Sequence, residues 1–220
     1  MKATHAAPSR ESGQPTPPAP GTGRSTGAAG LLALTTLVVG VVLGARPDIT
    51  DQSALGSFLQ TNGTRLFLAW LLITVSGLAW LCFVVGIRGM VPAGGGRDVF
   101  TLAAVAAQAA TWMGSALDTA TAPSGAQDVP LSDYTAFGEA GHLAGAAGIA
   151  ATGLALTGLA FAMRPRRTAW PRSLARFTMG AGILLMLTAP VGPVSLPVLA
   201  LWTAATSVTA FRLQGTAHAG

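Results

Sequence analysis

LFLAWLLITVSGLAWLCFVVGI, residues 66–87, contains 22 residues and no charged side chain. An α-helix rises about 1.5 Å per residue, so a helix of this length crosses the hydrocarbon core of a bilayer, which is about 30 Å thick. Hydrocarbon offers no hydrogen bonds to the backbone, which favours an uninterrupted helix. The stretch therefore predicts a transmembrane helix that ends just before Arg88.

Five further apolar runs have the same character. Half of the chain is apolar and only 10% of it is charged, a composition typical of integral membrane proteins. We expect an all-α bundle within residues 28–213. Its six transmembrane helices are expected over residues 28–45, 66–87, 99–117, 139–163, 177–191 and 194–211.

The remaining segments are less apolar. Residues 1–27 are rich in Pro, Ser and Gly and have no periodic apolar face, so we expect a disordered tail. The apolar run after this tail is longer than a signal peptide requires, which favours an uncleaved first helix. The connector 46–64 carries an apolar patch at 54–59 that predicts a short interfacial helix, and residues 214–220 form a short C-terminal tail.

Charge is segregated between the two sides of these six helices. Eleven of the 13 basic residues fall on the side of the termini, and six of the eight carboxylates fall on the other side. Loops rich in Lys and Arg stay in the cytoplasm, so we expect both termini to be cytoplasmic in the cell membrane. Arg46 and Arg65 are the two basic exceptions. The net charge of +5 thus reports topology rather than nucleic-acid binding, and the Arg-, Ala- and Gly-rich composition is typical of a GC-rich bacterial genome.

The largest basic cluster follows the fourth expected helix. Its members are Arg164, Arg166, Arg167, Arg172 and Arg176. One interpretation is a purely topological signal, and the other adds electrostatic contact with anionic lipid head groups, worth about 1 kcal/mol per basic residue. Lipid is accordingly the expected partner.

Polar residues recur at helical spacing along the third expected helix. They are Thr101, Gln108, Thr111, Ser115 and Asp118. Such a face either joins helices through hydrogen bonds, which is the commoner role, or lines a polar pathway. Along the fourth helix, Gly141, Gly145 and Gly148 form a small-residue face that predicts close packing on the third helix, with homo-oligomerisation as the alternative.

Three ionisable residues are expected at one depth near the outer face. Asp118 ends the third helix, and Glu139 and His142 lie one turn apart at the start of the fourth. A carboxylate, a histidine and a second carboxylate suit a divalent metal or a proton relay. The favoured interpretation is a helix-start carboxylate with side chains that reach interfacial water. No cofactor is expected, and Cys82, which lies in an apolar run, is expected to be a buried small hydrophobe.

The stretch from Leu55 to Arg88, with Asn62 and Arg65 at the start of its helix, carries a family resemblance. Further matching features are the segment 196–202, which ends in Leu-Trp, and Ser207 followed by Arg212. The chain resembles a family of uncharacterised six-helix bacterial integral membrane proteins. The resemblance implies this architecture and no activity, and the extended Pro-rich tail departs from the pattern.

No soluble-enzyme motif accompanies these features, so an enzymatic role is not favoured. Three functions stay open. The polar face of the third helix suits a small transport or sensing module, and the glycine face suits a scaffold or oligomeric partner protein. The third is a membrane enzyme with a metal site at the outer face.

Overall fold

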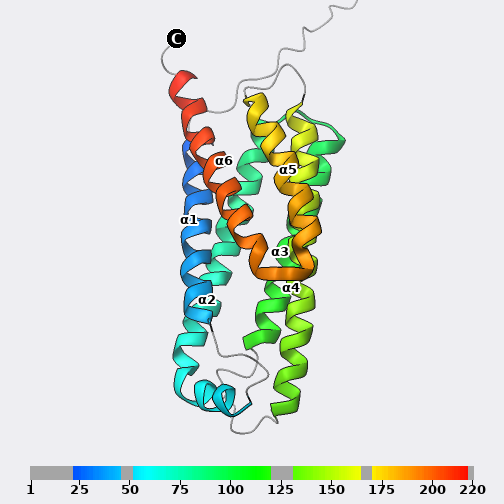
Figure 1. Ribbon diagram of the computed structural model, residues 1–220. Helices are drawn as coiled ribbons and strands as arrows, with labels where there is room; N and C mark the ends of the chain where they lie inside the picture. Colours follow the sequence, from blue (N-terminus) through cyan, green and yellow to red (C-terminus); the bar gives the residue numbers. More distant parts are fainter. Residues whose placement is uncertain (1–21, 46–51, 120–130, 165–169, 218–220) are drawn as a thin grey trace, which may run out of the picture.

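The computed structural model describes residues 22–45, 52–119, 131–164 and 170–217, and these residues contain helices and no strand. Six of the helices are long and apolar enough to cross a membrane, which confirms the expected all-α, six-helix architecture (Figure 1). The elements are α1 (Thr22–Gly44), α2 (Gln52–Met90), α3 (Gly95–Thr119), α4 (Leu131–Met163), α5 (Arg172–Thr188), the 3-10 helix η1 (Ala189–Val194) and α6 (Ser195–Ala217).

Several helices extend beyond the expected apolar runs. α1 begins at Thr22, so residues 22–27, which the sequence places in the tail, form its first turns; residues 1–21 lie outside the described part. α2 begins at Gln52 and is kinked at Asn62, where φ is −115° and ψ is 17°. The Asn62 side chain donates to the Phe58 carbonyl at 3.0 Å. The residues before this kink include the patch 54–59, for which the sequence predicts a short helix.

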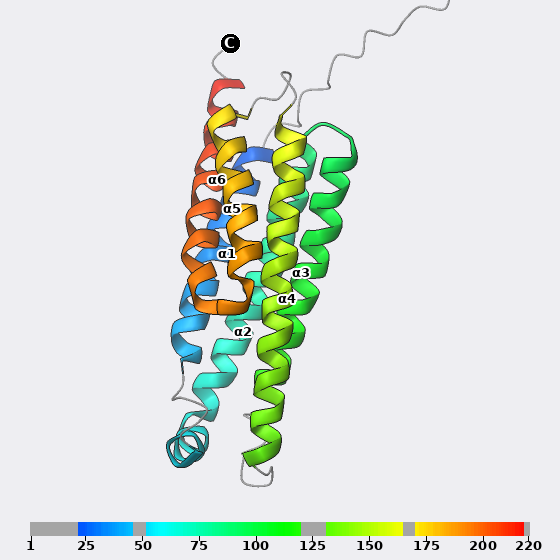
Figure 2. The ribbon, with the colours of Figure 1, turned by 45° about the vertical axis from the view of Figure 1, so that its right-hand side comes forward.

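The six long helices form a closed ring. Each packs against the next along the chain, and α6 returns to pack against α1 (Figures 1 and 2). The contact between α3 and α4 is the most extensive of these. Six helices arranged in a ring leave a space along its axis. The side chains that point inward determine how far this space is filled.

Glycine pairs allow close approach at two of the interfaces. A Cβ at Gly153 of α4 would lie 2.6 Å from the Gly182 carbonyl oxygen of α5, and a Cβ at Gly182 would lie 2.7 Å from the Gly153 oxygen. Gly158 of α4 and Gly96 of α3 have the same reciprocal relation, at 2.9 and 2.8 Å. Apolar association has no hydrophobic driving force in lipid, so such backbone contact supplies packing energy that larger side chains would prevent.

An aromatic cluster joins α2 to α6. Trp80 and Phe83 of α2 and Trp202 of α6 have ring centroids 5.7–5.9 Å apart, and both Trp202 contacts are edge-on, a preferred geometry for aromatic pairs. The Trp202 indole nitrogen donates to the Thr178 hydroxyl of α5 at 3.0 Å, and both of these residues are completely buried. This bond satisfies a buried donor where no water is at hand.

One end of the bundle is basic. Described arginines lie at the start of α1, α3 and α5 and near the end of α2, α4 and α6, and all of these helix termini meet at the same end (Figure 1). We call it the basic end; its described arginines are Arg24, Arg88, Arg97, Arg164, Arg172, Arg176 and Arg212. Trp170 lies buried there, and its indole nitrogen donates to the Met90 carbonyl at the end of α2, 3.2 Å away. This bond ties the start of α5 to α2.

Arg65 has a structural role at the opposite end. Its guanidinium donates to three carbonyls at the end of α1, with Nε bonded to Leu43 at 2.8 Å and Nη2 to Ala45 at 3.2 Å and Val42 at 3.4 Å. The last carbonyls of a helix have no partner within the helix and carry partial negative charge. Capping of α1 therefore accounts for one of the two basic residues that depart from the charge segregation.

The hairpin α5–η1–α6 is short. α5 contains 17 residues against 33 in α4, which correspond to about 25 and 50 Å of helix. The chain therefore turns back at η1 well short of the level at which α4 begins, opposite the basic end (Figure 2). The hydroxyls of Thr188 and Ser195 lie 3.1 Å apart across this turn, and Ser195 also reaches the Thr188 carbonyl at 3.3 Å.

Cys82 differs from the sequence expectation. Its side chain is exposed on α2 rather than buried. The residues next in chain, Phe83 and Val84, point inward and are at most 1% exposed. An apolar run in a transmembrane helix has a lipid side as well as a protein side, so hydrophobicity alone does not predict burial here.

The glycine contacts predict that a methyl group added at Gly153 and one added at Gly180 have different effects on the stability of the protein. Gly153→Ala should lower the stability by about 1–3 kcal/mol, because the new methyl group meets the α5 backbone. Gly180→Ala is the matched control, since a Cβ there meets nothing within 4 Å. It should be neutral or stabilising by up to about 1 kcal/mol through helix propensity. Thermal unfolding of both purified variants in one detergent measures the difference, and equal midpoints would contradict the packing.

Capping of α1 predicts a cost for Arg65→Met, which keeps the length of the side chain and removes its donors. The unfolding free energy should fall by about 1 kcal/mol, because the carbonyls lose charged hydrogen bonds at a partly hydrated site. Arg172→Met removes an exposed arginine at the basic end and is the control. A fall of the same size in both variants would show that loss of charge, not capping, causes it.

Candidate functional site

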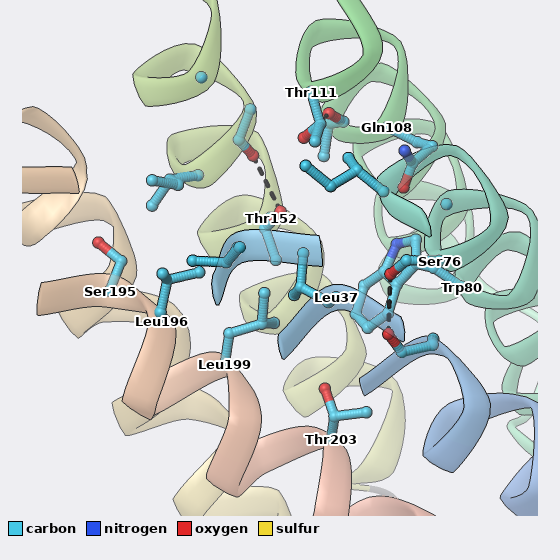
Figure 3. Close-up of a pocket in the computed structure, with 18 of the residues that line it drawn as sticks. Leu37, Ser76, Trp80, Gln108, Thr111, Thr152, Ser195, Leu196, Leu199 and Thr203 are labelled. Atoms are coloured by element: carbon cyan, nitrogen blue, oxygen red, sulfur yellow. Dashed lines mark hydrogen bonds between the residues drawn. The ribbon is translucent and has the colours of Figure 1, made fainter. Parts of the chain in front are cut away.

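A cavity of about 240 Å³ lies inside the helix ring. All six long helices contribute to its lining, and Figure 3 shows side chains that point into it from several sides. An apolar cavity of about 150 Å³ is large enough for benzene. The ring therefore has room for a somewhat larger organic molecule.

The cavity lies near the middle of the length of the bundle and reaches the turn at η1, where Leu185 and Ser195 line it. Counted along each helix from the arginine at its basic end, the lining residues lie 8 to 19 positions away, or about 12–28 Å. On α2 they run from Trp80 back to Ile73, and on α4 from Thr152 back to Gly145. The cavity is thus separated from the basic end by about two to three turns of each helix.

A dry core closes the cavity toward the basic end. We call this core the apolar plug; it consists of Phe83, Ile87, Phe100, Leu156 and Leu159, all completely buried. These side chains lie at most eight positions from the arginines of their helices. They belong to the main cluster of buried hydrophobic residues, together with Trp202. Buried hydroxyls also lie at this level, namely those of Thr178, Thr206 and Ser207, but none of these three residues lines the cavity.

The lining is neutral and has two kinds of wall. Of the described residues that line the cavity, none is charged. Gln108, Thr111 and Ser115 of α3 and Thr152 of α4 supply much of the polar part, whereas α1 and the start of α6 supply mainly leucines (Figure 3). A charged ligand would lose its hydration here without gaining a counter-ion. The chemistry of the walls therefore selects an uncharged, amphipathic guest.

Most hydroxyl groups on these walls already donate a hydrogen bond within the protein. Ser76 donates across to the Ala33 carbonyl of α1 at 2.8 Å, whereas Thr111 and Thr152 donate within their own helices to Ala107 and Gly148, both at 2.9 Å. Each of these hydroxyl oxygens still has lone pairs to offer.

Gln108 and Thr203 differ from the other polar lining residues. They are 7% and 3% exposed, and neither side chain has a hydrogen-bond partner among the described residues. Buried polar groups are normally paired, and an unpaired one in a low-dielectric interior is costly. Both groups sit on the cavity wall and are free to bind a guest.

The polar face predicted on α3 divides between two surroundings. Gln108, Thr111 and Ser115 line the cavity, whereas Thr101 lies nearer the basic end and donates to the Arg97 carbonyl of its own helix at 2.9 Å. The side chain of Asp118 lies outside the described part. Thr101 and Thr111 thus form no described bond between helices, and the face is chiefly a wall of the cavity.

The predicted glycine face also serves two purposes. A Cβ at Gly148 would lie 2.9 Å from the Thr111 hydroxyl of α3, and a Cβ at Gly114 of α3 would lie 2.8 Å from the Gly141 carbonyl oxygen. These positions face α3. Gly145 also lies against α3, since a Cβ at Gly114 would be 3.1 Å from the Gly145 nitrogen. It lines the cavity as well, and a Cβ on Gly145 itself would meet nothing within 4 Å.

The ionisable residues predicted near the outer face lie apart from the cavity. Glu139 and His142 are exposed on α4. Among the described side chains, which do not include that of Asp118, no three metal-binding groups lie together. Of the basic cluster, Arg164 lies over the Phe161 ring at 4.5 Å, and Arg172 and Arg176 are exposed. Arg166 and Arg167 lie outside the described residues.

Several residues that build the cavity were not predicted from the sequence. Trp80 and Ser76 on α2 and Thr203 and Ser195 on α6 line it. Their spacings of four and eight residues place each pair on one face of its helix. That signal was present in the sequence, but it does not reveal that the faces of α2 and α6 meet the face of Gln108.

Comparisons with known proteins add no further assignment. No protein family matches the chain, and the searches of curated proteins and of solved structures likewise find no match.

Proposed function

We propose that this membrane protein binds a small, uncharged, largely apolar molecule in the central cavity and acts as a transport or sensing module. The observation that carries the proposal is the buried Gln108 carboxamide, which has no described partner and lies on the wall of a neutral cavity large enough for a guest. The apolar plug favours binding and sensing over continuous passage, because its five large, completely buried side chains lie between the cavity and the basic end.

The other two functions receive less support. A scaffold that pairs through the glycine face would need that face free, but Gly141 and Gly148 are buried and lie against α3. A metal enzyme would need a ligand cluster, and Glu139 and His142 are exposed near the start of α4. Neither arrangement offers the recessed space that the cavity provides.

For orientation, we propose that the basic end faces the cytoplasm of a bacterial cell. The arginines at the basic end support this, since basic loops are retained in the cytoplasm. Their positions also suit contact with anionic lipid head groups. With an even number of membrane helices, this proposed orientation corresponds to cytoplasmic N- and C-termini.

Filling the cavity should abolish binding. Gly145→Leu adds an isobutyl group where a Cβ meets no atom within 4 Å, so the helices need not move apart. We expect at least a tenfold loss of affinity for a neutral probe such as 2-isopropenylnaphthalene, measured by quenching of tryptophan fluorescence in detergent. Gly180→Leu adds the same group to an exposed, open position on α5 and should bind like the wild type. Equal affinity in all three proteins would contradict the proposal.

The orientation predicts opposite labelling of two single cysteines in a Cys82→Ala background. Gly89→Cys lies at the basic end, and Ala136→Cys lies at the opposite end of α4; both positions are exposed. A membrane-impermeant maleimide should label Ala136→Cys in intact spheroplasts and Gly89→Cys in inverted vesicles. The reverse pattern would overturn the orientation and leave the cavity proposal standing.

A further inference from the structure

Two N–H groups of α3 meet at Gly77 of α2. A Cβ at Gly77 would overlap both Gln108 Nε2 and Trp112 Nε1, so these two nitrogens lie beside the same small space, one turn apart on α3. Trp112 Nε1 is buried without a hydrogen-bond partner. Because Gly77 has no side chain, it admits both groups and keeps them next to each other.

The chemistry of the two groups decides how the carboxamide is turned. An indole N–H can only donate, whereas a carboxamide presents an accepting oxygen on one side and two N–H donors on the other. A half-turn about the last side-chain torsion of Gln108 exchanges its oxygen and nitrogen and moves no other atom. The oxygen then faces Trp112 Nε1 and relieves a buried unpaired donor, which is costly in a low-dielectric interior. In this state Gln108 presents its N–H groups to the cavity.

A second unpaired donor lies on α6. The Thr203 hydroxyl is on the cavity wall and has no described partner, whereas the protons of Ser76, Thr111 and Thr152 are bonded to backbone carbonyls. Figure 3 shows Gln108 and Thr203 on different helices, with apolar side chains between them. The cavity therefore has side chains without a described partner at two places on its wall.

We propose, resting on the proposed binding function, that the ligand is a neutral, mainly hydrocarbon molecule whose carbonyl or ether oxygen accepts a hydrogen bond from the Gln108 carboxamide. The uncharged lining excludes amines and carboxylates as charged species. Scaled from the 150 Å³ that holds the six carbons of benzene, the volume of about 240 Å³ holds about 10 non-hydrogen atoms, and a few more at the closer packing of protein interiors. A diacyl lipid is far larger than this space.

Two probes of the same shape test the accepting oxygen. 2-Acetylnaphthalene carries a carbonyl, and 2-isopropenylnaphthalene replaces that oxygen with a CH₂ group. The ratio of their dissociation constants, measured by tryptophan quenching in one detergent, is compared between the wild type and Gln108→Met. The two probes partition differently into micelles, but this difference is the same for both proteins and therefore does not affect the comparison of their ratios. Thr101→Val is the control, since Thr101 is on α3 but does not line the cavity.

The preference for the ketone should fall about tenfold in Gln108→Met, the loss of one buried hydrogen bond, and should be unchanged in Thr101→Val. If Gln108→Met does not fold, Gln108→Leu makes the same test. Binding of both probes with an unaltered ratio would overturn the inference and leave the proposed function in place. Binding of neither probe to the wild type would overturn both. A phospholipid that copurifies in the cavity, detected by native mass spectrometry, would overturn the ligand class.

Discussion

The hydrocarbon core of a bilayer supplies no hydrogen bonds, and every other feature of this chain depends on that constraint. Backbone groups must pair within each segment, which is why the apolar runs become helices. Side-chain donors must also find acceptors. Ser76 reaches the Ala33 carbonyl, Trp202 reaches Thr178, and Arg65 caps the end of α1. Against this background, buried polar groups without partners are conspicuous, and on the cavity wall they are Gln108 and Thr203.

The ring of helices explains how such groups are kept without a partner. Glycine pairs such as Gly153 and Gly182 close the interfaces between neighbouring helices, and the large side chains of the apolar plug fill the centre only near the basic end. Around the middle of the bundle, the residues that point inward include leucines, threonines and glycines and leave space between them. Neighbouring helices are thus closely packed against each other, whereas the centre of the ring is incompletely packed. The cavity is the part of the centre that side chains do not fill.

The helices were predictable from the sequence because an apolar run of about 20 residues has few other ways to satisfy its backbone. Their ends were less predictable: hydropathy does not register the helical residues 22–27, or the helix before the kink at Asn62. Gln108, Thr111 and Ser115 were recognised as one face from spacing alone. The cavity itself was not, because it depends on which faces of α1, α2 and α6 meet α3, and those contacts join residues far apart in the chain. The chemistry of Glu139 and His142 suggested a site near the outer face, but both side chains are exposed and neither lines the cavity.

The central claim is that a small neutral molecule binds inside the ring, beside Gln108. The most direct measurement is an experimental structure of the protein with 6-bromo-2-acetylnaphthalene, in which anomalous scattering locates the bromine. The account predicts one strong peak within the cavity, between α1, α3 and α6, with the ketone oxygen in hydrogen-bond range of the Gln108 carboxamide. Bromine found only on the lipid-facing surface of the helices, with the cavity empty, would contradict it.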